Sequence, residues 1–165
     1  MATIASAPPM ISLNIKDIIP TITMWREASG EGIEGMLAVG LVIRNRALYR
    51  KLSFAEVCLQ PYQFSSMTEE WANPALRNLI NPALLRWPKE SDTSFKLAVA
   101  AWYHSAKLVG SDDDPTDGAD YYYADTIFPP AWAKDYQFTA QIGHHRFYRS
   151  PAATRLSAGR PQQPG

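Results

Sequence analysis

The segment from Ile33 to Tyr49 constrains the fold most, because its apolar residues are too closely spaced for a helix with a solvated side. These apolar positions are Met36, Leu37, Val39, Leu41, Val42 and Ile43. A surface helix carries a single apolar stripe, whereas a helix that is apolar on several faces is buried. We therefore expect a central helix over residues 33–49. The chain has 165 residues, which suits one domain whose core needs no disulfide framework.

Three further helices are predicted around this one. The first starts at or just before Pro20, because proline is tolerated in the first turn of a helix, and ends near Ala28. The second is short and starts at Ser53, which has the spacing of a capping box with Glu56. The third covers residues 93–109. Together they predict a mainly helical body.

After the last of these helices, the chain becomes rich in aromatic and β-branched residues. Runs at 121–123, 138–142 and 145–148 lie between turn residues and predict short strands. Residues 61–90 contain four prolines and predict loop with short helical turns. A helical body followed by a small antiparallel sheet is an α+β fold.

The two ends of the chain differ from its middle in composition. Residues 1–10 and 150–165 are rich in proline and small residues, so we expect a disordered N-terminus, one domain over residues 11–149 and a flexible tail. Residues 1–10 lack the charged and apolar regions of a signal peptide, so synthesis in the cytoplasm is expected. The single cysteine, Cys58, cannot form an intramolecular disulfide and is predicted to be a buried thiol.

Charge and histidine content limit the classes of partner. Sixteen basic residues balance sixteen acidic ones, so no overall field attracts nucleic acid, and no nucleic-acid partner is expected. The three histidines are His104, His144 and His145, and none belongs to a His-Glu-x-x-His motif. A zinc peptidase or amidase needs three suitably spaced ligands. We therefore expect no metal and no other cofactor.

Glu27 is the acidic residue whose position suggests chemistry. It comes at the end of a predicted helix, just before Gly30 and Gly32, where another segment can approach closely. A half-buried carboxyl group has its charged form disfavoured, which suits a general acid. A solvated glutamate, or one paired with Arg26, is the ordinary alternative.

Five motifs in a fixed order extend this hypothesis to most of the chain. They are EASGE at 27–31, GMLAVGLVIRNR at 35–46, QPYQFS at 60–65, GADYYY at 118–123 and IGHHRFY at 142–148. In this order they resemble the SleB/CwlJ cell-wall hydrolase family of spore cortex-lytic enzymes and lysins. Ser29, Asp120 and Ala124 depart from the family pattern, where Arg, Thr and Asn are usual, and this puts substrate preference and rate in question.

The resemblance implies a lysozyme-like fold and cleavage of the bond between N-acetylmuramic acid and N-acetylglucosamine, with Glu27 as the acid. It favours lytic transglycosylation, in which the sugar's own C6 hydroxyl attacks. A muramidase-type hydrolase that uses a second carboxylate, Asp120 or Glu31, is the alternative. A non-catalytic wall-binding or virion module is a third possibility.

The remaining motif residues are expected to bind the glycan. They are Gln63, Phe64, Ser65, Asp120, Tyr122, Tyr123, His145 and Tyr148. Because side chains alternate along a strand, Tyr122 must face away from Tyr121 and Tyr123, so at least one of the three is structural. Asn45 and Arg46 are expected to hold a loop.

The resemblance to this family also implies expectations about partners and cellular location. The resemblance implies that the substrate is bacterial peptidoglycan, and we expect a monomer that acts as a lysin on the periplasmic cell wall. A holin-type pore partner is the expected route of release.

Overall fold

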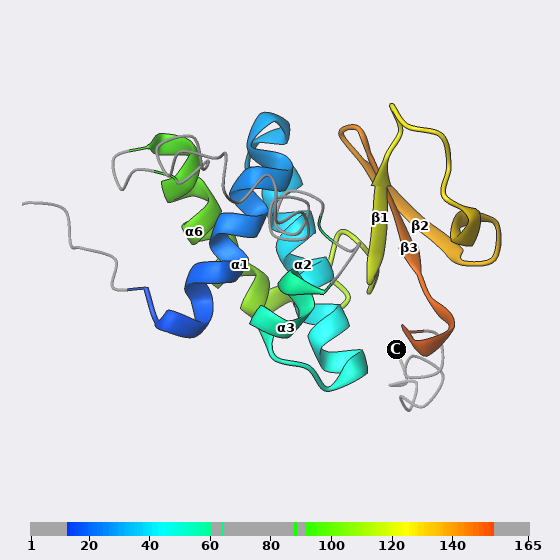
Figure 1. Ribbon diagram of the computed structural model, residues 1–165, viewed down its shortest axis with the longest axis horizontal. Coiled ribbons are helices and arrows are strands. Elements are labelled where there is room, and N and C mark those ends of the chain that lie inside the picture. The colour runs from blue at the N-terminus through cyan, green and yellow to red at the C-terminus, as the bar shows by residue number, and fades with distance from the viewer. Residues whose placement is uncertain (1–12, 61–63, 65–87, 89–91, 154–165) are drawn as a thin grey trace, which may run out of the picture.

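Helix α2, from Gly32 to Arg50, is the central element expected over residues 33–49. In the computed structural model it lies between the other helices and a small sheet (Figure 1). The structure describes residues 13–60, 64, 88 and 92–153. Eleven residues of α2 are buried, including Val39, Leu41 and Ile43, so the dense apolar pattern predicted its position correctly.

Helix α1, Ile15–Ala28, begins earlier than Pro20 predicts. Pro20 lies inside the helix, where it lacks the N–H that would bond to the carbonyl group of Lys16. Lys16 is exposed, so water can satisfy that carbonyl. The short 3-10 helix η1, Ser29–Glu31, then joins α1 to α2.

Two more helices complete the body. Helix α3, Phe54–Leu59, starts after Ser53, and both hydrogen bonds of the predicted capping box with Glu56 are present. Helix α6, Thr93–Leu108, packs against both α1 and α2. None of the helices in the described part of the chain is long and apolar enough to cross a membrane.

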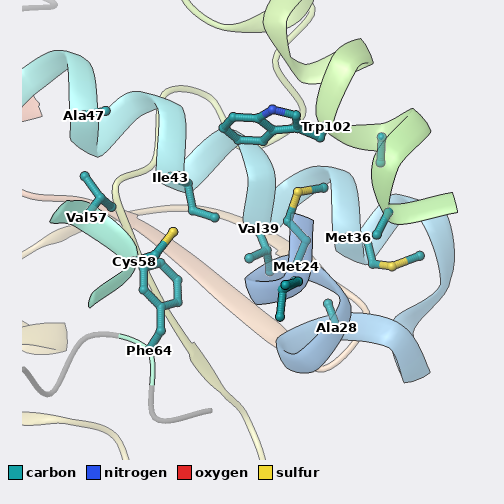
Figure 2. Close-up of a cluster of buried hydrophobic side chains, with 13 residues drawn as sticks. Met24, Ala28, Met36, Val39, Ile43, Ala47, Val57, Cys58, Phe64 and Trp102 are labelled. Carbon is teal, nitrogen blue, oxygen red and sulfur yellow. The ribbon is translucent and has the colours of Figure 1, made fainter. Parts of the chain in front are cut away.

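The core lies where α1, α2, α3 and α6 meet. Figure 2 shows Met24 and Ala28 beside Val39, with Cys58 next to the ring of Phe64. Burial raises the pKa of the Cys58 thiol to about 12, as expected for a structural cysteine.

A polar contact joins α1 to α6 within this core. Trp102 is fully buried, and its Nε1 donates a hydrogen bond of 2.8 Å to Oδ1 of the buried Asp17. The guanidinium group of Arg44 lies over the indole ring at 3.7 Å and donates to the carbonyl oxygen of Trp102 at 2.9 Å. Each buried polar group of this contact therefore has a partner.

The sheet has three antiparallel strands in the order β1-β3-β2. They are β1 Tyr121–Ala124, β2 Gln137–Ile142 and β3 His145–Arg149, close to the expected ranges. One face packs on α2 through Phe147, Ala140 and Ile142. The architecture is therefore the expected α+β arrangement.

The opposite face of the sheet carries an aromatic cluster. The 3-10 helix η3, Ala131–Lys134, brings Trp132 into contact with this face. The rings of the cluster belong to Tyr121, Tyr123, Trp132, Tyr136, Phe138 and Tyr148. They hold the segment between β1 and β2 against the sheet.

The described chain extends slightly past the expected domain boundary. Ser150 and Ala153 are buried, so these two residues of the expected tail pack against the fold. The expected disordered segment 1–10 and the rest of the expected tail lie outside the described residues, as does nearly all of the predicted loop at 61–90.

Candidate active site

Glu27 lies in the last turn of α1, where the helix gives way to η1 and the chain turns towards the sheet. Its side chain is half-buried. Oε2 of Glu27 accepts a hydrogen bond of 3.1 Å from the hydroxyl group of Tyr122 on β1. The helical body and the sheet therefore meet at this carboxylate.

Tyr122 is held from several sides. Its ring lies 4.9 Å from the ring of His145, 5.6 Å from Phe147 and 6.2 Å from Phe64, measured between centroids. Burial raises the pKa of the Tyr122 hydroxyl well above its ordinary value, and the charge of Glu27 and the hydrogen bond to it act in the same direction. The hydroxyl group therefore remains protonated and serves as a donor to Glu27.

His145, the first residue of β3, stands beside Tyr122 and is 7% exposed. Burial lowers its pKa, and the charges of Glu31, Glu27 and Asp125 partly oppose this effect. Its Nδ1 atom is buried without a hydrogen-bond partner in the described part of the chain. A neutral imidazole ring therefore lies within the field of the two glutamates.

Glu31, at the end of η1, contacts the turn between β2 and β3. Its Oε2 accepts a hydrogen bond of 3.2 Å from the backbone N–H of His144. Figure 1 shows this turn at the same end of the molecule as the junction between α1 and α2. Glu31 thus lies at the site, with its carboxylate directed at the hairpin.

Asp125 follows β1 directly and binds the same turn. Its N–H donates to the carbonyl oxygen of His144 at 2.7 Å, and its Oδ1 lies 3.3 Å from Nδ1 of the His144 ring. Sequence inspection overlooks Asp125, since only the pairing of β1 with β3 brings it beside the histidines. The glycine of the IGHHRFY motif was the available signal for the tight turn.

Asn45 and Arg46 of α2 fix the segment that leads into β1, as expected. Nδ2 of Asn45 donates to Oδ2 of Asp114 at 3.2 Å and to the carbonyl oxygen of Ala119 at 3.0 Å. Nε and Nη2 of Arg46 donate to the carbonyl oxygen of Asp120 at 2.9 and 2.5 Å. These bonds fix the start of β1 against α2 and thereby help to position Tyr122 next to Glu27.

The structure buries Asp120 in a contact with Ser150, contrary to the expectation that it binds the glycan or acts as a second carboxylate. It is fully buried, and its carboxylate accepts hydrogen bonds from the backbone N–H and the hydroxyl group of Ser150, at 2.8 and 2.5 Å. The position of Asp120 next to the tyrosines in the sequence did not reveal that its side chain points towards Ser150. Asp120 joins the start of β1 to the end of β3.

Of the predicted glycan-binding aromatics, Tyr122 donates a hydrogen bond to Glu27. Tyr123 and Tyr148 are stacked on each other at 5.7 Å on the opposite face of the sheet, as the alternation along β1 requires. Phe64 is 1% exposed and its ring packs against that of Tyr122, so it supports Tyr122 from within the core. Gln63 and Ser65 lie outside the described residues.

The chemistry available here is proton transfer. A carboxyl group held in place by a neutral phenol can give and take a proton at a bound substrate. Within residues 13–60, 64, 88 and 92–153, no three His, Cys, Asp or Glu side chains are grouped so that they could hold a metal ion.

Comparison with known proteins matches this architecture to a family. The family model described as Cell Wall Hydrolase matches residues 30–148, well over half of the chain. The chain belongs to the cell wall hydrolase family. The match starts three residues after Glu27 and includes Glu31, Tyr122 and His145. No curated protein gives a significant match to this hydrolase.

Solved structures show the same fold. The hydrolase is similar to the catalytic domain of the germination-specific lytic transglycosylase SleB from Bacillus anthracis, with a TM-score of 0.58 and 22% identity over 87% of this chain and 100% of that chain. The catalytic domain of the Bacillus cereus SleB protein gives a TM-score of 0.55 and 21% identity, over 88% and 100%. The predicted lysozyme-like fold is confirmed.

Proposed function

We propose that this cell wall hydrolase cuts the glycan strands of peptidoglycan between N-acetylmuramic acid and N-acetylglucosamine, as a lytic transglycosylase with Glu27 as acid and base. The observation that carries the proposal is the hydrogen bond of 3.1 Å from Tyr122 to Glu27, at the junction of the helical body and the sheet. It rests also on the likeness to SleB, a lytic transglycosylase.

In the proposed reaction, Glu27 first protonates the glycosidic oxygen, and the bond from that oxygen to C1 of the muramic acid breaks. Positive charge develops on the sugar ring as it does. The C6 hydroxyl group of the same sugar then attacks C1, and its proton passes to the Glu27 carboxylate. The products are a free N-acetylglucosamine end and a 1,6-anhydro sugar, and no water is consumed. Tyr122 orients the carboxylate throughout.

The engagement of other carboxylates favours this route over hydrolysis. A hydrolase of the retaining or inverting type needs a second carboxylate that attacks the sugar or activates water. Asp120 is bound to Ser150, and Glu31 is bound to the His144 amide. Asp125 contacts Gln141 and His144. The C6 hydroxyl group requires no such residue.

The test is mass spectrometry of the muropeptides released from purified peptidoglycan. Wild type, Glu27→Gln and Glu34→Gln are compared, and the last serves as a matched control because Glu34 is an exposed residue of α2. We expect wild type and Glu34→Gln to release anhydro products that borohydride does not reduce, and Glu27→Gln to release none. Reducible muramic acid ends would instead indicate a muramidase-type hydrolase.

Three other results would reject the proposal. Free peptides would indicate an amidase or peptidase, and full activity of Glu27→Gln would exclude this residue as the acid. Binding to peptidoglycan without release of any product by wild type would favour the non-catalytic module.

The proposal includes a role as a lysin, released to the wall through a pore-forming partner. Expression in a Gram-negative host with and without a holin-type protein tests it. Lysis only when both are present supports the role, and lysis by the hydrolase alone removes the need for the partner.

A further inference from the structure

The side chain of Glu31 spans the gap between the helical body and the hairpin tip. It comes from η1, and its Oε2 accepts the His144 N–H from a residue 113 positions away in the chain. This contact lies beside the hydrogen bond between Glu27 and Tyr122, because His144 precedes His145, whose ring contacts Tyr122. Two acidic side chains of adjacent elements therefore bind the sheet at neighbouring points.

Two glycines, Gly143 in the turn between β2 and β3 and Gly35 of α2, lie directly against the Glu31 side chain. A Cβ atom added to Gly143 would collide with Oε2 of Glu31, and one added to Gly35 would collide with the Cβ atom of Glu31. Gly143 also has a φ of +56°, a conformation that glycine adopts without strain. The half-buried Glu31 side chain is thus packed against Gly35 at its Cβ atom and against Gly143 at its carboxylate.

Glu31 also acts on His145 through its charge. Three carboxylates oppose the effect of burial on the pKa of His145, and Glu31 has the largest effect of the three. The other groups facing this ring are Glu27 from α1, Asp125 after β1 and the neighbouring His144. The Tyr122 ring covers it from β1. Glu31 is therefore tied to the site by geometry and by electrostatics.

We propose that Glu31 is a positioning residue of the active site, which fastens the turn between β2 and β3 to the helical body and so places Tyr122 and His145 opposite Glu27. The catalytic part of this inference rests on the proposed function. Its structural part, which concerns the hairpin and His145, does not.

The experiment compares Glu31→Gln, Glu31→Ala and the matched control Glu34→Gln. The amide oxygen of glutamine can still accept the His144 N–H, whereas alanine removes both the bond and the charge. Four quantities are measured for each protein. They are the hydrogen exchange of the His144 amide, the NMR titration of the His145 ring, and kcat and KM on soluble uncrosslinked glycan strands.

We expect Glu31→Ala to lose the protection of the His144 amide and to lower kcat by on the order of 100-fold with KM little changed, because a displacement of about 1 Å at a reacting group has this effect. Glu31→Gln should keep the protection and lose much less activity. In both variants the titration midpoint of His145 should move to lower pH, because a charge that stabilises the imidazolium ion is gone. Glu34→Gln should match wild type.

Two outcomes would overturn the inference. If protection, titration and kcat of Glu31→Ala all equal those of wild type, Glu31 positions nothing. If Glu31→Gln is as inactive as Glu31→Ala while its His144 amide stays protected, Glu31 is a catalytic carboxylate and not a positioning residue. Failure of the proposed function is distinguishable, because wild type would then release no anhydro product while the NMR results are unaffected.

A double-mutant cycle tests the fit between Glu31 and Gly143 without any activity assay. Gly143→Ala should lower the free energy of unfolding by less in the Glu31→Ala background than in wild type, because the collision is absent there. The backbone strain at Gly143 is the same in both backgrounds and cancels. Additive effects of the two substitutions would contradict the proposed fit.

Discussion

The hydroxyl group of Tyr122 and the carboxylate of Glu27 lie 3.1 Å apart although 95 positions separate them in the chain. This contact joins a helix end to a strand of the sheet, so the orientation of the Glu27 carboxylate depends on both parts of the fold. A change in how the sheet packs on α2 would therefore change the orientation of the Glu27 carboxylate.

Replacing Tyr122 with phenylalanine tests this dependence. We expect the rate of muropeptide release to fall about 10- to 100-fold, because a hydrogen bond to a charged group contributes about 1.5–3 kcal/mol and about 1.4 kcal/mol is a factor of ten. The ring and its packing are kept, so the melting temperature should change little. Tyr103→Phe, at an exposed position of α6, is the control. An unchanged rate in Tyr122→Phe would separate the hydroxyl group from catalysis.

Asp120→Asn should weaken folding more than catalysis. The substitution removes the charge from two hydrogen bonds to Ser150 and leaves the buried Arg46 without the nearby carboxylate. We expect the free energy of unfolding to fall by about 1.5–3 kcal/mol. Urea denaturation measures this, and the rate per folded molecule should stay near that of wild type. A stable but inactive Asp120→Asn would restore Asp120 as a second catalytic carboxylate.

The buried His145 should make folding less favourable in mild acid. Its pKa in the folded state lies below the ordinary value of 6.5, so the unfolded chain binds more protons as the pH falls through 6.5. Stability from this residue is thus fully present above about pH 6.5 and declines towards the lowered pKa. Denaturation of wild type and His145→Gln between pH 7.5 and 5 measures the difference, with the exposed His104→Gln as control. Parallel pH profiles for all three proteins would argue against this.

Trp102→Phe should be strongly destabilising. It removes volume from the centre of the core and leaves the buried Asp17 carboxylate without its 2.8 Å donor. A buried acceptor without a partner costs about 1–3 kcal/mol, to which the lost packing adds. Combining Trp102→Phe with Asp17→Asn should cost less than the sum of the two single changes. Calorimetry of wild type, the two single variants and the double variant gives the coupling energy between Trp102 and Asp17. Strictly additive losses of stability would refute the predicted coupling.

Much of the fold was predictable because local patterns report burial well. The dense apolar run of α2, the capping box at Ser53 and the aromatic runs of the sheet each predicted an element to within a residue or two at most ends. The predicted start of α1 was wrong. The helix tolerates Pro20 in its interior because Lys16, whose carbonyl group is left unpaired, is exposed.

The site was predictable only in part, because sequence gives residue types and alternation but not direction across long separations. Alternation correctly divided Tyr122 from Tyr121 and Tyr123, yet it did not tell which face meets Glu27. The burial of Asp120 against Ser150, and the reach of Glu31 to His144, depend on which strands pair. Strand order is set by contacts that no local pattern encodes.

The middle strand of the sheet is also its last strand along the chain, and this has a consequence for biosynthesis. β1 and β2 each pair with β3 and not with each other. Until residues 145–149 have left the ribosome, Tyr122 belongs to a strand without a partner, and Glu27 lacks its donor. The nascent polypeptide thus carries Glu27 long before β1 has its partner strand, so the proposed site cannot assemble until residues 145–149 have been made.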